Sequence, residues 1–222
     1  MVGDLTGMQL IQGNTALTLM GMYDVATAHF DIDGDGDQDL RLGFFRESTL
    51  GMGLRTWAWL LPLDTGLALG GSHATDTTFI RTEVDTMNPG SQWTVEIRTT
   101  THFNCSPMPG ATDSSFSPDR PQLERYISGE WLSADQNFIT DSINLFAGPL
   151  QYTSTLGMIG LSNDTATTVQ STFTRDCNYP SFGSPTYVGF RINGANGPRV
   201  GWLLFTIVDE SSILIHQVVV QP

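Results

Sequence analysis

The sequence predicts an all-β protein, an antiparallel β-sandwich that is jelly-roll or lectin-like in outline. Short apolar runs alternate with Gly, Thr and Ser throughout the chain, as is typical of strands separated by turns. No long segment places its apolar residues at helical spacing. The chain has 222 residues, of which 40% are hydrophobic, enough to bury a sizeable core. We therefore expect one domain that covers residues 1–222.

The candidate strands are segments in which apolar and β-branched residues alternate with polar ones between turn residues. In chain order they are residues 16–20, 25–30, 40–45, 55–61, 77–84, 92–100, 139–144, 158–161, 167–174, 187–192, 199–208 and 213–220. Residues 104–121 are rich in Pro, Ser and Asp and are expected to form a long loop. Residues 121–131 are expected to hold a short helix or an irregular turn.

The charge of the chain excludes several classes of partner. Its 23 acidic and 10 basic side chains give a formal net charge of −13, which argues against nucleic acid or an anionic membrane as a partner. No apolar run of about 18 residues is present, so no membrane span is expected. Lysine does not occur, and the commonest hydrolase, metalloprotease and dinucleotide-binding motifs are also missing. We expect a protein that is not an enzyme.

The most informative segment is Asp-Ile-Asp-Gly-Asp-Gly-Asp-Gln-Asp at residues 31–39. Alternating aspartates let several carboxylates converge on one hard cation, and Gly36 permits the sharp turn that wraps it. The pattern favours Ca²⁺ over Mg²⁺, which requires a more rigid octahedron. The predicted ligands are the side chains of Asp31, Asp33, Asp35 and Asp39 and the main-chain carbonyl of Asp37. A solvated acidic turn is the alternative, since Asp and Gly favour turns in any case.

This segment departs from an EF-hand, because its twelfth position is Leu42 and not the bidentate Glu. The remaining D-x-D-x-D-G-x-x-D pattern resembles the calcium loops of FG-GAP and VCBS-type repeats, dockerins and thrombospondin type 3 repeats. In FG-GAP proteins such a loop joins two strands. The present chain is similar, with residues 25–30 leading into the loop and Leu40, Leu42 and Phe44 alternating after it.

A second resemblance lies near the end of the chain. Residues 187–192 and 199–204 flank a turn rich in Asn and Gly, which predicts a hairpin. Within it we expect one row of residues to face another: Val188, Phe190 and Ile192 against Val200, Trp202 and Leu204. An early Asp loop followed by a late Gly-Trp hairpin and one last strand resembles a group of secreted bacterial β proteins. That resemblance implies a secreted or cell-surface location and no established activity.

Cys105 and Cys177 are the only cysteines, and both lie in loop-like surroundings. In a protein with a calcium loop, such a pair suggests an oxidising compartment and one disulfide. Two free thiols are the alternative.

The aromatic residues leave open whether the chain binds sugars. Trp57 and Trp59 share one face of a strand, and we expect the row of Trp57, Trp59 and Leu61 to be a buried side of the sandwich. If that row is exposed, it forms a platform on which sugar rings can stack. Tyr126 and Trp131 lie in the irregular middle and are expected to be exposed, as possible ligand-binding residues.

The sequence therefore leads to an expected function. The chain is expected to be an extracellular or cell-surface module, stabilised by Ca²⁺, with a structural, adhesive or assembly role. Its partner would be a second copy or another surface protein. The alternative is a carbohydrate-binding module whose partner is a glycan.

Overall fold

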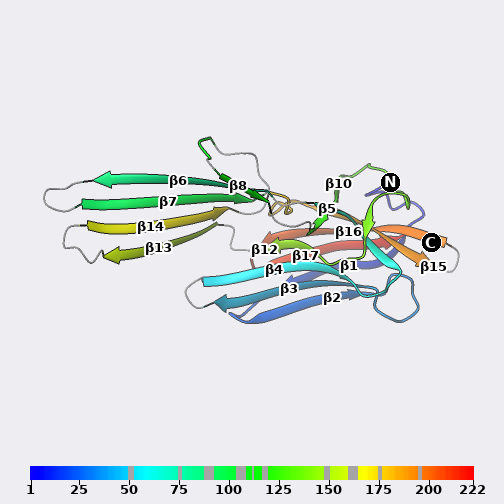
Figure 1. Ribbon diagram of the computed structural model, residues 1–222. Helices are drawn as coiled ribbons and strands as arrows, with labels where there is room; N and C mark the ends of the chain where they lie inside the picture. Colours follow the sequence, from blue (N-terminus) through cyan, green and yellow to red (C-terminus); the bar gives the residue numbers. More distant parts are fainter. Residues whose placement is uncertain are drawn as a thin grey trace. The chain divides into compact units, whose positions relative to one another are not determined.

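The computed structural model describes residues 1–49, 53–74, 77–87, 93–103, 109–111, 113–116, 120–147, 151–159, 165–174, 177–194 and 197–222. All regular secondary structure within these ranges is β-strand, which confirms the all-β prediction (Figure 1). The strands are β1 (Gln9–Thr18), β2 (Asp24–Phe30), β3 (Leu40–Thr49), β4 (Gly53–Pro62), β5 (Leu67–Ala74), β6 (Thr77–Met87), β7 (Trp93–Phe103), β8 (Asp113–Phe116), β9 (Arg120–Leu123), β10 (Arg125–Tyr126), β11 (Phe138–Ile139), β12 (Ile143–Ala147), β13 (Gln151–Ile159), β14 (Thr165–Thr174), β15 (Thr186–Gly194), β16 (Gly197–Asp209) and β17 (Ser212–Val220).

The chain divides into two compact units, each built from separate stretches of sequence. Unit 1 comprises Met1–Ala74, Arg120–Ala147 and Tyr179–Pro222, and unit 2 comprises Thr75–Asp119 and Gly148–Asn178. The single domain expected for residues 1–222 stays a prediction.

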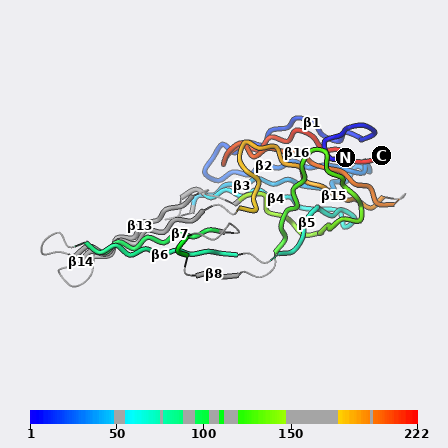
Figure 2. The backbone as a smooth tube through the Cα atoms, turned by 90° about the horizontal axis from the view of Figure 1, so that it is seen from above, coloured from blue at the N-terminus to red at the C-terminus, as the bar shows by residue number. Residues whose placement is uncertain are grey.

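Unit 1 is a sandwich of two sheets. One has the order β1-β17-β16-β15-β5-β11, with β10 paired to β15 and β9 paired to β5, and the other has the order β12-β4-β3-β2. The first and last strands of the chain, β1 and β17, are antiparallel neighbours, and both chain ends lie in this unit (Figure 2). The described parts of unit 1 therefore form an antiparallel β-sandwich, as the sequence predicts.

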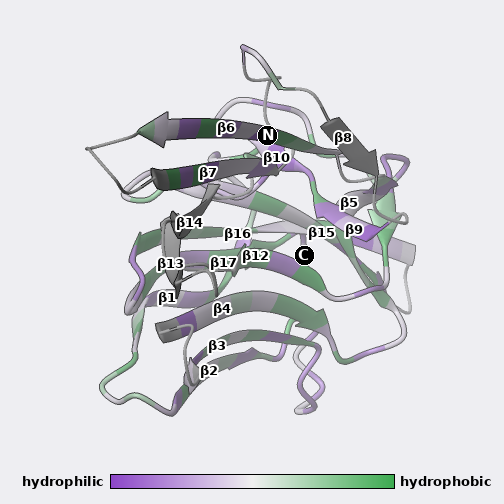
Figure 3. Ribbon diagram, turned by 60° about the vertical axis from the view of Figure 1, so that its left-hand side comes forward, coloured by the Kyte–Doolittle hydropathy of each residue, from purple (hydrophilic) through white to green (hydrophobic). Residues whose placement is uncertain are grey.

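The core of unit 1 follows from alternation along its strands. In the smaller sheet Leu40, Leu42 and Phe44 are fully buried, as the residues after the Asp loop predict. In the larger sheet Phe190 and Phe205 are equally buried. Burial of each such side chain contributes about 1.5–3 kcal/mol, so the two facing layers account for much of the stability of the unit. Figure 3 shows hydrophobic residues recurring along these strands.

The larger sheet is also covered in part on its other face. Val2, Tyr126, Trp202 and Val219 form a buried cluster there. Tyr126 is 6% exposed, so the expectation of an exposed Tyr126 is wrong. The reason is local: the tyrosine ring lies over Gly70 and Gly189, where an added Cβ would come within 3.1 Å and 3.0 Å of it.

The late hairpin forms, but its facing row differs from the prediction. Val188 lies opposite Leu203 and Phe190 lies opposite Gly201. Trp202 is paired with Gly189 and is buried in the cluster with Val2. The pairing is shifted by one residue relative to the expected row, and such a shift moves a side chain to the opposite face of the sheet.

The expected burial of Trp57, Trp59 and Leu61 is wrong. The buried residues of β4 are Thr56, Ala58 and Leu60, whereas the two tryptophans and Leu61 are only half-buried. Both faces of this strand carry apolar residues, so alternation alone does not reveal which face meets the core.

Several other elements differ from the expected ones. Strand β5 was not expected, because Gly70 and Gly71 are typical of turns. These glycines instead permit close packing in the sheet, since a Cβ on Gly71 would lie 2.6 Å from the Gln122 carbonyl oxygen. In place of a short helix in 121–131, the chain forms β9, β10 and a turn.

Unit 2 is a five-stranded sheet with the order β13-β14-β7-β6-β8. All of its pairs are antiparallel except β14 with β7, which is parallel. Its β6–β7 ladder carries ion pairs from Arg98 to Glu96 and Asp85. Unit 2 thus departs from the purely antiparallel expectation at one ladder.

Candidate metal centre

The acidic loop joins β2 to β3 in unit 1, where the two strands form a tight antiparallel pair. Phe30 is opposite Leu40 at the end of the ladder, and the backbone N–H of Asp39 donates to the carbonyl of Phe30 over 2.9 Å. Phe30, Ile32 and Leu40 are all buried. These apolar residues anchor both ends of the loop and so fix where its carboxylates point.

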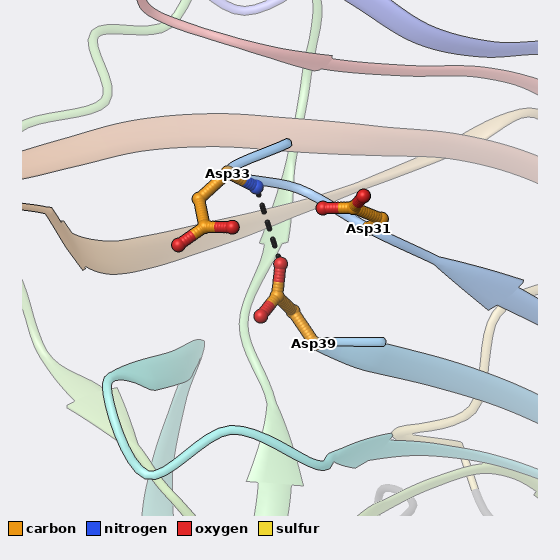
Figure 4. A group of neighbouring side chains, drawn as sticks. All are labelled: Asp31, Asp33 and Asp39. Carbon is orange, nitrogen blue, oxygen red and sulfur yellow. Dashed lines mark hydrogen bonds between the residues drawn. The ribbon is translucent and has the colours of Figure 1, made fainter. Parts of the chain in front are cut away.

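Three carboxylates converge in this loop, those of Asp31, Asp33 and Asp39 (Figure 4). One oxygen from each lies within 4.8 Å of the others. Two oxygens that bind the same Ca²⁺ at about 2.3–2.6 Å are at most about 5 Å apart. The spacing of the three side chains therefore fits a shared metal ion.

Backbone hydrogen bonds hold the first carboxylate of the group in place. Both oxygens of Asp31 accept an N–H, from Gly34 over 2.7 Å and from Gly36 over 3.0 Å. Gly34 and Gly36 have φ values of 84° and 100°, a conformation that glycine adopts without a steric penalty. The curled backbone that the sequence predicts is present at these two residues.

Asp39 is the buried member of the group, with 2% of its surface exposed. Its Oδ2 accepts the N–H groups of Ile32 over 2.6 Å and Asp33 over 3.2 Å. Burial raises the pKa of Asp39 above its ordinary value, the two N–H groups act against this rise, and the charges of Asp33 and Asp64 add to it. A bound cation would favour the ionised form of this carboxyl group.

Asp64, from the segment between β4 and β5, is a neighbour that sequence reasoning missed. Besides its charge effect on Asp39, its own N–H donates to the Asp39 carbonyl over 3.3 Å, and Leu63 donates to the same carbonyl over 2.7 Å. No sequence pattern signals this contact, because Asp64 lies far from the loop in the sequence. The acidic loop is thus tied to the end of β4.

The other two predicted ligands do not join the group. Asp35 and Asp37 are exposed, and Oδ1 of Asp35 accepts the N–H of Asp37 over 2.8 Å. Coordination by the Asp35 side chain and by the Asp37 carbonyl stays a prediction.

The remaining candidate residues lie elsewhere. Trp131, in the segment that follows β10, is 75% exposed, in agreement with the expectation. Cys177 is an exposed residue of unit 2, whereas Cys105 lies outside the described residues. No cysteine within the described part of the chain is free, but the pairing of Cys105 with Cys177 stays a prediction.

The fold and this site together define a class: a β-sandwich protein whose acidic strand-to-strand loop can hold a metal ion. No protein-family description matches the chain, and neither a curated protein nor a solved structure is significantly similar to it. In the described residues, no helix is long and apolar enough to cross a membrane.

Proposed function

We propose that the chain is an extracellular or cell-surface module with a structural, adhesive or assembly role, in which Ca²⁺ bound by the β2–β3 loop stabilises the sandwich. The convergence of Asp31, Asp33 and Asp39 carries this proposal. Three carboxylates so close together repel one another. A cation relieves that repulsion, and it links β2 and β3, two neighbouring strands of the smaller sheet.

The donor set favours calcium over other ions. All three candidate side chains offer oxygen, whereas zinc sites are built mainly from Cys and His. Calcium accepts six to eight oxygens in flexible geometry, which suits a loop whose remaining ligands would be the Asp35 side chain, the Asp37 main-chain carbonyl and water. Extracellular modules commonly bind Ca²⁺ with dissociation constants of about 10⁻⁴ to 10⁻³ M.

The first experiment measures thermal unfolding with and without calcium. With such an affinity, 1 mM Ca²⁺ stabilises by about 0.4–1.4 kcal/mol, so chelation should lower the melting temperature by about 1–5 °C. Asp33→Ala should lower the melting temperature similarly and abolish the response to chelator. Asp37→Ala is the matched control, because its predicted contact is the main-chain carbonyl, and it should respond as the wild-type protein does.

Two outcomes would contradict the proposal. A melting temperature that does not change over the range from chelator to 10 mM Ca²⁺ would leave the loop a solvated acidic turn. An equal loss of the calcium response in Asp33→Ala and Asp37→Ala would show that the response depends on the total negative charge of the loop. It would not then depend on the particular group of Asp31, Asp33 and Asp39.

A further inference from the structure

The outer face of the smaller sheet of unit 1 carries aromatic side chains that the core does not use. Thr56, Ala58 and Leu60 of β4 point into the sandwich and are buried. Trp57 and Trp59 therefore project from the opposite face, where they are half-buried. A sheet face turned away from the core is normally polar, so two tryptophans here call for an explanation.

Trp59 is held in a fixed position by a glycine on the neighbouring strand. Gly43 of β3 lies opposite Trp59, and a Cβ added to Gly43 would collide with the six-membered ring of the indole and lie 2.8 Å from its Nε1. Gly43 is itself buried. The indole thus lies against the backbone of the glycine, and the rest of the Trp59 side chain stays partly exposed.

Trp57 is fixed by an aromatic neighbour. It stacks on Phe45, its partner across β3 and β4, with ring centroids 5.6 Å apart and an interplanar angle of 20°. Successive rows on one face of a strand are about 7 Å apart. Trp57 and Trp59 therefore form two adjacent aromatic positions whose orientations are set before any ligand arrives.

Polar side chains border this aromatic pair. Asn144 of β12 lies opposite Trp59, Thr27 of β2 lies opposite Gly43, and both are exposed. Arg41 lies two residues before Gly43 on the same face and is half-buried. These groups can donate hydrogen bonds to hydroxyl groups of a molecule lying on the indole.

We propose that this outer face binds an uncharged polysaccharide, with a pyranose ring stacked on Trp59 and its neighbour in the chain of sugars against Trp57. Pyranoses with equatorial hydroxyl groups present flat C–H faces to an aromatic ring and direct their hydroxyls sideways, toward Asn144, Thr27 and Arg41. The net charge of −13 disfavours a polyanionic glycan. The proposal goes beyond the calcium-binding function and does not depend on it.

The test is isothermal titration of the full chain with cellohexaose, chitohexaose and xylohexaose, three neutral oligosaccharides of equatorial β-1,4-linked pyranoses. At least one should bind with a dissociation constant below about 1 mM. Trp59→Ala should weaken that binding about tenfold or more, as expected for loss of one aromatic stacking partner. Leu10→Ala removes an apolar side chain of β1 in the larger sheet, which is 60% exposed, and should leave the affinity unchanged.

Asn144→Ala separates sugar binding from simple hydrophobic contact, because it leaves the aromatic rings in place. It should weaken binding about threefold to tenfold, with an unchanged melting temperature. An unchanged affinity in this variant would overturn the assignment of Asn144 as a hydroxyl partner and, with it, the pose proposed here.

Three results would overturn the proposal as a whole. One is the absence of binding to all three oligosaccharides at 5 mM. Another is equal weakening by Trp59→Ala and Leu10→Ala. The last is a concentration-dependent dimer that dissociates in Trp59→Ala without any sugar binding, since the face would then belong to a second copy of the chain.

Discussion

At the scale of single residues, close packing in the larger sheet depends on a glycine in β16. A Cβ on Gly201 would collide with the Val219 carbonyl oxygen and lie 2.5 Å from the Phe190 ring. Backbone and a fully buried aromatic ring cannot easily give way. The position therefore admits no side chain, and this is why Phe190 can pack across the hairpin.

We predict that Gly201→Ala lowers the free energy of unfolding by about 1–3 kcal/mol, the usual cost of overpacking. Gly13→Ala is the matched control, because Gly13 is an exposed strand residue with no atom within 4 Å of an added Cβ. Urea unfolding measures both variants. Equal stabilities would show that the sheet relaxes around the new methyl group.

At the scale of elements, the turn between β1 and β2 is organised by the carboxylate of Asp24, a half-buried residue. Oδ2 of Asp24 accepts the N–H of Met20 over 2.6 Å, and Oδ1 accepts the N–H of Val25 over 2.9 Å. The hydrogen bond from Met20 is the main cause of a pKa for Asp24 below its ordinary value. The ionised form therefore stabilises the folded state.

Since the folded-state pKa of Asp24 is the lower one, its stabilising effect is present above the ordinary pKa of about 3.9 and is lost as pH falls through the lowered value. We predict that Asp24→Asn unfolds at lower urea concentration than the wild type at pH 7, and that the difference shrinks below about pH 4. Asp135→Asn is the control, because Asp135 is exposed and its carboxylate accepts no hydrogen bond in the described residues. A difference that persists at pH 2.5 would argue against this role.

The sequence predicted the elements whose signals are local. The acidic loop is one example, since its curvature depends on residues within it, Asp31, Gly34 and Gly36, and the alternation of Leu40 and Phe44 places β3. The prediction of which face of β4 is buried was wrong. That face depends on Gly43 of another strand, β3, which leaves room for Trp59 on the outer face. Strand β5 and the burial of Tyr126 were missed for the same reason, since Gly70 is needed only where a distant ring approaches.

At the scale of the whole molecule, the two cysteines belong to the two separate stretches of unit 2, Thr75–Asp119 and Gly148–Asn178. A bond between Cys105 and Cys177 would join these stretches and close a long loop, worth up to about 4–5 kcal/mol in the chain-entropy model. We predict that neither cysteine reacts with a thiol reagent in the native, unreduced protein, and that reduction lowers the melting temperature. Reaction of both thiols before unfolding would establish that they are free.

The connections between the units make it possible to test whether unit 1 folds by itself. Ala74, before unit 2 begins, is opposite Arg120, where unit 1 resumes, in the antiparallel pair of β5 and β9. A two-residue Asn-Gly turn can join such a pair. The second connection, from Ala147 to Tyr179, can be made with a flexible linker of about twelve Gly and Ser residues.

We predict that this shortened chain, without residues 75–119 and 148–178, folds and unfolds cooperatively. The buried residues Phe44, Leu60, Phe190 and Phe205 all lie within unit 1, so its core remains complete. The calcium response should also persist, because the β2–β3 loop lies wholly in the retained part. The measurement is thermal unfolding by circular dichroism with and without chelator. If the shortened chain shows no cooperative transition while the full chain unfolds in a single step, the chain is one cooperative domain over residues 1–222.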